Sequence, residues 1–450
     1  MSVNRRTFLK AGAAVIAANA VSARGPLMAQ IGRVPEAIPP IDDPRLQSLA
    51  ARALDAAREA GATYADVRLT HTKSRRFYPL FTFDEESMEV GVRALVNGYW
   101  GFASGPVWAP DEMFRLGHEA AHEGKINALG KPRAAALAPA PVVHDGNWDM
   151  PVGIDPFSIS PFEVEDFLTG LEDYALRTPN LTILLNVAVA DVQSKAFAST
   201  TGSYLSQRCF RTEGSFAAGM RIVKGRKEGA FSLDCLTPAG MGFELYAADH
   251  IPHVRKNPVQ EEIRRSIEEC KEEMLLPVKP IDVGRYDVVL DAITMAGILD
   301  QTIGRATELD RALGYEANAG GTSYLNDPLS MLGSYQIGAP KLTVSANRSD
   351  PGSAATVRWD DEGIAPDDFK LVENGMLSDF QTTRESAAWL EPYHTKRGTI
   401  LRSHGCASAP SAVDVPMQHT PNLTLETSRE GNDFTSLVAG LSKGVAIKNV

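Results

Sequence analysis

The segment from Leu181 to Tyr246 constrains the fold most, because it reads as strand after strand with no helix between. The strand pattern covers three runs: LTILLNVAVADVQ, KAFASTTGSYLSQRCF and SFAAGMRIVKGRKEGAFSLD. Thr201-Gly202 and Lys224-Gly225 supply turns within this segment. Successive hairpins build an antiparallel sheet, whereas parallel strands need helical crossovers. We therefore predict an α+β protein with an antiparallel sheet.

Helices and strands on both sides of this segment extend the α+β pattern. The run LQSLAARALDAAREAG has apolar residues at helical spacing and stops at Gly61: Leu46, Leu49, Ala53 and Ala57. Asn97-Gly98 forms a tight turn between two predicted strands. The strands are expected over 64–70, 88–96 and 100–103, and amphipathic helices over 162–177 and 258–276.

These elements divide the chain of 450 residues into four segments. We predict an export signal over 1–30, a linker over 31–44, an N-terminal and central α+β domain over 45–276, and a mostly antiparallel, β-rich C-terminal domain over 277–450. Pro277 and Pro280 mark the connection between the two domains.

The N-terminus carries a twin-arginine export motif. The motif NRRTFLK supplies its characteristic residues: Arg5, Arg6, Phe8, Leu9 and Lys10. The Ala-rich run that follows is too short and too weakly apolar for a bilayer, which needs about 20 apolar residues, so no transmembrane span is predicted. We expect the twin-arginine translocase to export the folded chain and the mature protein to be periplasmic. The position of signal cleavage stays open.

Charge and cysteine content narrow the class of partner. The chain has 45 Lys and Arg against 56 Asp and Glu, a net charge of -11. Proteins that bind duplex nucleic acid concentrate basic residues, so no nucleic-acid partner is predicted. After export the four cysteines would meet an oxidising compartment: Cys209, Cys235, Cys270 and Cys406. Cys209 and Cys235 could face each other across strands, but spacing leaves the pairing open.

Several motifs in the second half resemble one family of peptidases. Residues 299–310 read LDQTIGRATELD and resemble the frame LLHEAIGHGLEGD of the TldD/PmbA family, also called modulator of DNA gyrase. Three flanking motifs follow the order of the family: GRYDVVLD, GYEANAGGTSYL and WDDEGIAPDDFKLVENGMLSDF. In the first half, YADVRL, GVRALVNGYWGFASG and DPF resemble its N-terminal domain. The resemblance implies a TldD/PmbA-type fold across most of the chain.

The chemical positions of the family motif are replaced in this chain. TldD-type members are expected to hold zinc with the two His of HExxxH and a later Cys, while the Glu polarises the bound water. These positions fall on Asp300, Gln301, Arg305 and Ile447. Gln301 cannot act as a base, and the permanent charge of Arg305 repels a cation. We therefore expect no metal here.

Three interpretations of residues 300–310 stay open. The first is a retained structural helix in which Glu308 pairs with Arg305. The second is a repurposed polar site that binds a peptide terminus or carboxylate through four residues: Asp300, Arg305, Glu308 and Asp310. The third is an unusual zinc site at residues 300–305.

A rival zinc motif, HExxH, lies at His118, Glu119 and His122, with His144 or Asp149 downstream as a third ligand. The same helix is expected to bury Met113, Leu116 and Ala120, which turns both His side chains toward solvent. A solvated polar face is therefore the expectation, and zinc binding is the alternative. His250, His253 and the acidic run Asp360 to Glu362 are weaker candidates with expected structural roles.

These patterns predict an exported TldD/PmbA-family metallopeptidase-type protein that is a non-catalytic subunit of a heteromeric peptidase. We expect no cofactor in this chain, zinc in a second TldD/PmbA-family subunit, and small or unfolded peptides as substrates. One alternative is an active zinc metallopeptidase using His118, Glu119 and His122 or residues 300–305. Another is a non-enzymatic peptide-binding or assembly factor. The family's second domain continues past the point matched by LSKGVAIKNV, so we expect the final sheet to be incomplete at Val450.

Overall fold

The computed structural model describes residues 41, 43–130, 134–179, 181–222, 227–232, 239–247, 259–277, 279–318, 320–426 and 433–448. Residues 41–450 cluster as one compact unit, and the predicted export signal, including Arg5 and Arg6, lies outside the described residues. The structure is mixed α/β with antiparallel sheets, as the sequence predicted.

Nine described strands form one large sheet in the order β11-β8-β6-β5-β1-β2-β3, with β4 and β7 also pairing with β6. All neighbours are antiparallel except β4 and β6. The strands are β1 (Tyr64–Tyr78), β2 (Phe81–Val96), β3 (Tyr99–Gly105), β4 (Gly146–Asp149), β5 (Leu181–Ser199), β6 (Tyr204–Ile222), β7 (Lys227–Ser232), β8 (Ala239–Gly240) and β11 (Gly352–Ser353). Because β11 comes from the C-terminal half, both halves of the chain contribute to this sheet.

Strands β1 and β2 are much longer than the sequence pattern predicted. Their outer halves, 71–78 and 81–87, are rich in charged residues and lack alternating burial. Ion pairs across the two strands join Arg75 to Asp84 at 2.8 Å and Arg76 to Glu85 at 3.0 Å. Opposite charges at facing or diagonal positions stabilise two paired strands that have no apolar face, which explains why apolar periodicity did not predict these strand halves.

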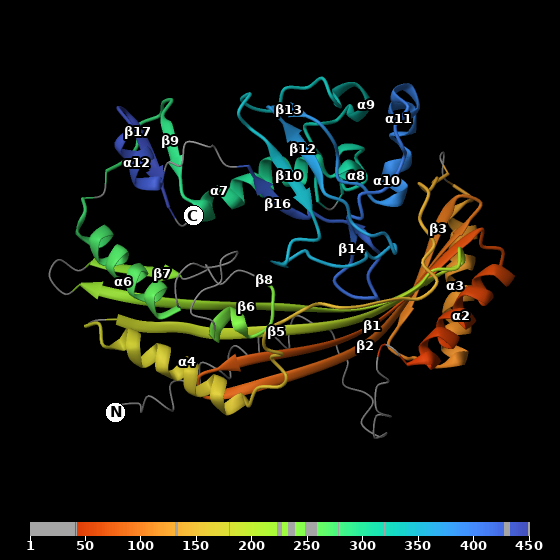
Figure 1. Ribbon diagram of the computed structural model, residues 1–450, viewed down its shortest axis with the longest axis horizontal. Coiled ribbons are helices and arrows are strands. Elements are labelled where there is room, and N and C mark those ends of the chain that lie inside the picture. The colour runs from red at the N-terminus through yellow and green to blue at the C-terminus, as the bar shows by residue number, and fades with distance from the viewer. Residues whose placement is uncertain are drawn as a thin grey trace. The chain divides into compact units, whose positions relative to one another are not determined.

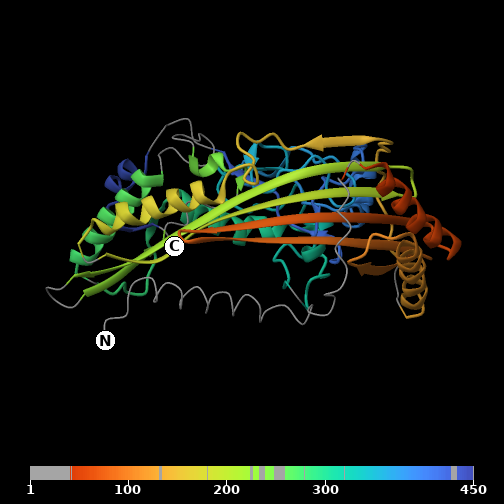
Figure 2. The same cartoon turned by 90° about the horizontal axis from the view of Figure 1, so that it is seen from below.

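Helices cover one face of the large sheet (Figures 1 and 2). α2 (Pro44–Glu59) and α3 (Pro110–Asn127) pack on Val67 and Leu69 of β1, while α4 (Pro161–Leu176) and α6 (Val259–Leu275) share a core with Phe77. A short helix, α5, spans Glu244–Ala247. Since side chains alternate along a strand, Asp66 and Arg68 point to the opposite face, which is polar and faces the C-terminal half.

The C-terminal half consists of short strands and short helices. A four-stranded sheet has the order β13-β12-β10-β16, β14 pairs with β15, and β9 pairs with β17 in parallel. The strands are β9 (Asp287–Leu290), β10 (Val344–Asn347), β12 (Phe369–Glu373), β13 (Met376–Leu377), β14 (Ala407–Ser408), β15 (Met417–Gln418), β16 (Asn422–Leu425) and β17 (Gly444–Ile447). The helices are α7 (Ala292–Leu299), η1 (Asp300–Gly304), η2 (Arg305–Thr307), α8 (Leu309–Ala312), α9 (Pro328–Met331), α10 (Arg384–Ala388), α11 (Glu391–Arg397) and α12 (Phe434–Ala439).

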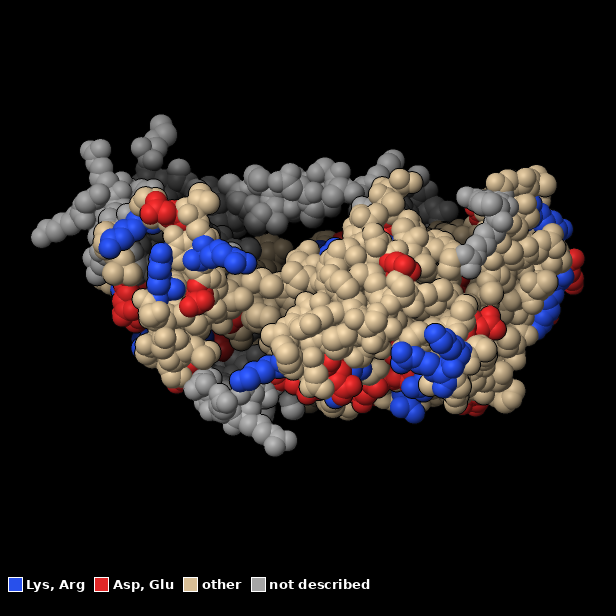
Figure 3. Space-filling view, turned by 90° about the horizontal axis from the view of Figure 1, so that it is seen from above, with Lys and Arg blue, Asp and Glu red and all other residues tan. Residues whose placement is uncertain are grey.

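The surface in Figure 3 carries its Lys and Arg side chains in separate small groups, with Asp and Glu side chains among them. Within the part of the chain that the structure describes, no helix combines the length and the apolar character needed to cross a bilayer. The predicted domain boundary at 276–277 falls between α6 and β9.

Candidate functional site

The motif segment 299–310 begins as a regular helix and then widens. α7 passes into η1, a π-helical turn in which the backbone N–H of Arg305 donates to the carbonyl oxygen of Asp300, five residues earlier. π-turns inside helices are uncommon, and those that occur often lie at functional sites. The five-residue spacing of the HExxxH frame matches this turn, so positions 300 and 305 come to lie beside each other.

The residues that replace the zinc ligands bind one another. Asp300 Oδ2 accepts a hydrogen bond from Arg305 Nε at 3.3 Å and another from Gln301 Nε2 at 2.8 Å. Both members of the ion pair are partly exposed, with 38% of the Asp300 side chain and 51% of the Arg305 side chain accessible to solvent. A guanidinium and an amide donate but cannot ligate a cation, so these residues do not fit a zinc ion.

Glu308 is buried and paired with a different arginine from the one the sequence suggested. The predicted pairing of Glu308 with Arg305 is wrong, because Glu308 Oε2 binds Arg311 Nε at 2.8 Å and its Oε1 accepts from Thr420 at 3.0 Å. The π-turn directs Arg305 toward Asp300 instead. The structure therefore separates the proposed four-residue polar site into the exposed pair Asp300 and Arg305 and two carboxylates on the other side, Glu308 and Asp310.

Asp310 lies next to this buried cluster. Burial raises its pKa to about 7, and the negative charge of Glu316 adds to the effect. The side chain accepts a hydrogen bond from the backbone N–H of Arg311 at 2.7 Å. Asp310 is thus held by its own helix, α8, on the buried side of the motif.

Residues far away in sequence fix the shape of the π-turn. Gln381, which is fully buried, donates from Nε2 to the carbonyl oxygen of Gly304 at 2.5 Å and to Thr307 Oγ1 at 3.0 Å. Tyr324 donates its hydroxyl to the carbonyl oxygen of Thr302 at 2.9 Å. Ile447, at the expected thiolate position, lies in β17 and pairs with Leu290 of β9. Its carbonyl oxygen accepts a hydrogen bond from the backbone N–H of Asp291 at 3.1 Å. Sequence reasoning missed Gln381 and Tyr324, because no local pattern links them to the motif.

The rival motif lies on α3. His118, Glu119 and His122 are exposed, the carboxylate of Glu119 binds Arg115, and the ring of His118 stacks on Phe114. Across the described ranges, no group of three or more His, Cys, Asp or Glu side chains is arranged to hold a metal ion. His144 hydrogen-bonds the carbonyl of Gly202 at 3.2 Å. The residues described at this motif do not fit a zinc site, and His250 and His253 lie outside the described residues.

Cys209 and Cys406 are each buried with a free thiol. Burial raises the pKa of the Cys406 thiol to about 12, and it also raises that of Cys209. Cys235, the other member of the possible pair with Cys209, lies outside the described residues.

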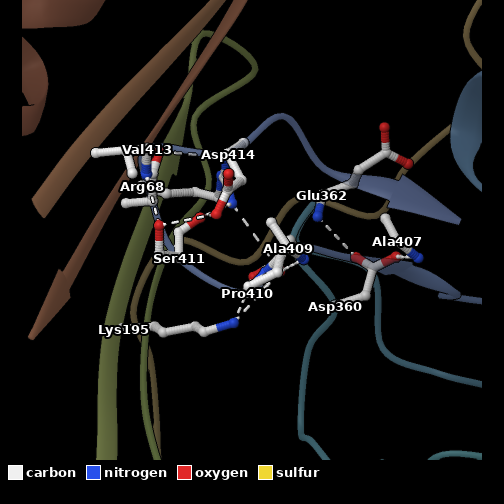
Figure 4. Close-up of polar contacts among 12 residues, drawn as sticks. Arg68, Lys195, Asp360, Glu362, Ala407, Ala409, Pro410, Ser411, Val413 and Asp414 are labelled. Atoms are coloured by element: carbon white, nitrogen blue, oxygen red, sulfur yellow. Dashed lines mark hydrogen bonds and ion pairs between the residues drawn. The ribbon is translucent and has the colours of Figure 1, made fainter. Parts of the chain in front are cut away.

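The acidic run Asp360 to Glu362 forms a turn against the polar face of the large sheet (Figure 4). Asp360 Oδ1 accepts hydrogen bonds from the backbone N–H groups of Glu362 and Ile364, and its Oδ2 accepts from Ala407 at 3.1 Å. Burial, with the charge of Glu362, raises the pKa of Asp360 to about 7. These bonds agree with the structural role expected for the run.

Basic side chains from the sheet neutralise the rest of this acidic turn. Lys195 Nζ lies 2.9 Å from Asp361 Oδ1, and Arg93 Nη1 lies 3.3 Å from Glu362 Oε1. Burial disfavours the charge of Asp361, but Lys195 and Arg68 outweigh burial and lower its pKa to about 2. The acidic turn therefore connects the two halves of the chain through ion pairs. Its basic partners, Lys195 and Arg93, were not among the residues that the sequence pattern indicated.

His404 is a further buried charged group that sequence reasoning missed. Its Nδ1 lies 3.1 Å from Asp367 Oδ2, its Nε2 lies 3.2 Å from Asp379 Oδ2, and its ring stacks on Phe369 with 4.0 Å between centroids. His404 is 37 residues from Asp367 and 25 residues from Asp379 along the chain, so no local pattern marks the cluster.

Comparisons with known proteins agree with this architecture. Residues 283–450 match the family model of the PmbA/TldA metallopeptidase C-terminal domain. A metalloprotease of Methanocaldococcus jannaschii is 23% identical over 347 residues, covering 74% of this chain and 69% of that protein. TldE from Thermococcus kodakarensis has a similar fold with a TM-score of 0.64, 12% identity, and coverage of 89% of this chain and 82% of that one. A putative modulator of DNA gyrase from Thermotoga maritima gives a TM-score of 0.62 and 18% identity, with coverage of 90% and 82%.

The fold, the C-terminal domain and the motif frame together define a metallopeptidase-like protein of mixed α/β architecture. Residues 283–450 carry the TldD/PmbA-family C-terminal domain, and the relatives and the similar folds support the family that the sequence motifs predicted.

Proposed function

We propose that this chain is a non-catalytic subunit of a metallopeptidase assembly that binds small or unfolded peptides. The observation that carries the proposal is the ion pair between Asp300 and Arg305, which occupies the turn where the family motif places its two histidines. Arg305 keeps its charge at every accessible pH, and Gln301 cannot accept a proton from water. Neither residue can perform the step assigned to that position in a zinc peptidase.

The zinc is then supplied by a second TldD/PmbA-family subunit. The retained motif frame supports this part of the proposal. The buried Gln381 and the ion pair of Glu308 with Arg311 hold the turn at residues 300–305 in shape, although the expected zinc ligands are replaced there. Export by the twin-arginine translocase to the periplasm belongs to the same proposal, on the residues Arg5, Arg6, Phe8, Leu9 and Lys10. Replacement of Arg5 and Arg6 by Lys, followed by cell fractionation, tests export.

Metal analysis tests the subunit role. The purified chain alone is expected to bind no stoichiometric zinc, whereas the complex with a co-expressed related subunit is expected to contain zinc and to cleave an unfolded peptide. Stoichiometric zinc in the isolated chain that is lost in His118→Ala, but kept in Asp300→Ala, would refute the proposal and favour catalysis at the exposed HExxH motif. Peptide binding without cleavage in every combination would favour a non-enzymatic binding factor.

A restored motif provides the matched gain-of-function test. The combined changes Asp300→His, Gln301→Glu, Arg305→His and Ile447→Cys return the expected ligand set to one chain. We expect this variant to bind zinc, with Asp310→Asn in the unmodified chain as a control that leaves the four replaced positions, Asp300, Gln301, Arg305 and Ile447, unchanged. Failure of the restored variant to bind zinc would show that the frame has also lost its metal geometry.

A further inference from the structure

The turn between β14 and β15, residues 410–414, is held on the polar face of the large sheet almost entirely through its backbone. All five of its successive carbonyl oxygens accept a hydrogen bond from a side chain of that sheet. The bonds run from Gln193 to Pro410 at 3.1 Å, from Arg68 to Ser411 at 3.4 Å, from Arg68 to Ala412 at 3.5 Å, from Ser104 to Val413 at 3.5 Å and from Arg68 to Asp414 at 2.5 Å. Figure 4 shows Arg68 directed at this turn.

The side chains of the turn contribute little to its attachment. Val413 and, just beyond the turn, Val415 are 39% and 48% exposed, and only Ala412 is fully buried. Ala412 can lie this close because Gly91 of β2, which pairs with Arg68 across the strands, has no Cβ atom. A Cβ atom at Gly91 would overlap the carbonyl oxygen of Ala412. The sheet therefore recognises main-chain carbonyls, which every polypeptide has.

The contacts at Arg68 also indicate that the turn can be displaced. Three of the five bonds are longer than usual, since the ordinary range is about 2.7–3.2 Å for N–H to oxygen and about 2.5–3.0 Å for O–H to oxygen, and such long bonds are weak. Arg68 is only 3% exposed, and its Nε has no hydrogen-bond partner. Burial lowers the pKa of Arg68, which means that its charged form is disfavoured by the loss of water. When the turn lifts, hydration of the guanidinium offsets part of the free energy lost with the hydrogen bonds.

We propose that residues 410–414 occupy, in cis, a binding site for a polypeptide main chain, built from Arg68, Gln193 and Ser104, and that an unfolded peptide binds there when the turn lifts. This inference rests on the proposed function and adds a site and its regulation. Arg68 offers five N–H donors in a rigid fork, which suits several carbonyl oxygens of one backbone segment. Recognition through carbonyls makes the site independent of peptide sequence.

Gly91→Ala tests this inference, because the added methyl group would overlap the carbonyl oxygen of Ala412 and is expected to displace the turn, while Arg68 itself is not changed. The matched control is Gly170→Ala in α4, where a Cβ atom meets nothing within 4 Å. The probe is an unstructured, fluorescein-labelled peptide of Ala, Ser and Gly, and binding is followed by fluorescence anisotropy on the full chain with its partner subunit. If the turn covers the site in about nine of ten molecules, Gly91→Ala is expected to raise the apparent affinity about tenfold.

A second change separates a binding site from a structural attachment. Arg68→Gln in the Gly91→Ala background is expected to abolish the gain, and Gly170→Ala is expected to leave the affinity unchanged. A shortened hairpin that lacks residues 411–414 is expected to reproduce the gain if Gly91→Ala fails to fold. Faster proteolysis within 410–414 without any gain in peptide affinity would overturn the inference. If the unmodified chain still binds the peptide in that case, the proposed function is unaffected. Absence of peptide binding in all variants, with and without the partner, would refute both.

Discussion

The imidazole of His404 should make the stability of this protein depend on alkaline pH. The ring lies between Asp367 and Asp379 and is 9% exposed. Burial by itself would lower the pKa of His404, but the hydrogen bonds to the two carboxylates outweigh burial and raise the pKa from 6.5 to about 9. Because folding raises this pKa, the protonated ring stabilises the fold fully below about pH 6.5, and the contribution is lost as pH rises through 9.

The size of this contribution follows from the two pKa values. The difference between 6.5 and about 9 corresponds to about 3 kcal/mol of unfolding free energy, at roughly 1.4 kcal/mol for each pKa unit. Urea denaturation of the wild type and of His404→Gln at several pH values between about 6 and 10 measures the difference directly. Only the wild type should show the additional loss of about 3 kcal/mol, since other alkaline titrations are common to both proteins.

His118→Gln provides the matched control, because it removes an exposed imidazole that stacks on Phe114 and is not held between two carboxylates. The reasoning is refuted if wild type and His404→Gln lose the same unfolding free energy across this pH interval. It is equally refuted if the wild type becomes more stable as pH rises through 9.

Two further predictions concern buried charges. Arg93→Met should lower the unfolding free energy by about 3–5 kcal/mol in a denaturant titration, because Asp66 and Glu362 would stay buried without their cation. The control Arg76→Met removes an exposed ion pair and should lower the unfolding free energy by less than about 1 kcal/mol. Equal losses in the two variants would contradict the argument. Asp310→Asn should raise the unfolding free energy at about pH 8 by about 2–4 kcal/mol, because folding raises the pKa of Asp310 to about 7 and so disfavours the ionised carboxylate. The gain should vanish near pH 4. A gain that does not change with pH would contradict the raised pKa.

The large antiparallel sheet could be predicted from sequence wherever one face of a strand is apolar. Val67 and Leu69 alternate with polar residues and lie under α2 and α3, so their strand was found. The outer halves of β1 and β2 were not found, because cross-strand ion pairs such as Arg75 to Asp84 replace apolar burial there. Apolar periodicity carries no information on which charges will face each other.

At the motif, spacing predicted the positions of the replaced ligands but not their partners. The expected pair of Glu308 with Arg305 assumed a regular helix, in which residues three apart are neighbours. The π-turn adds a residue to that helical turn, which brings Asp300 to Arg305 and leaves Glu308 to Arg311. The side chain of Gln381, far away in the chain, donates a hydrogen bond to the backbone carbonyl oxygen of Gly304 and supports this local change.

By itself, the sequence determined the family frame and the donor chemistry at Asp300, Gln301, Arg305 and Ile447, because the capacity to ligate a metal or accept a proton belongs to each side chain. The tertiary structure alone decided which buried charges meet, as Lys195 does with Asp361, and which carbonyls Arg68 holds. Hydrogen bonds and ion pairs act over a few ångströms, and only folding brings residues from distant strands and turns to that separation.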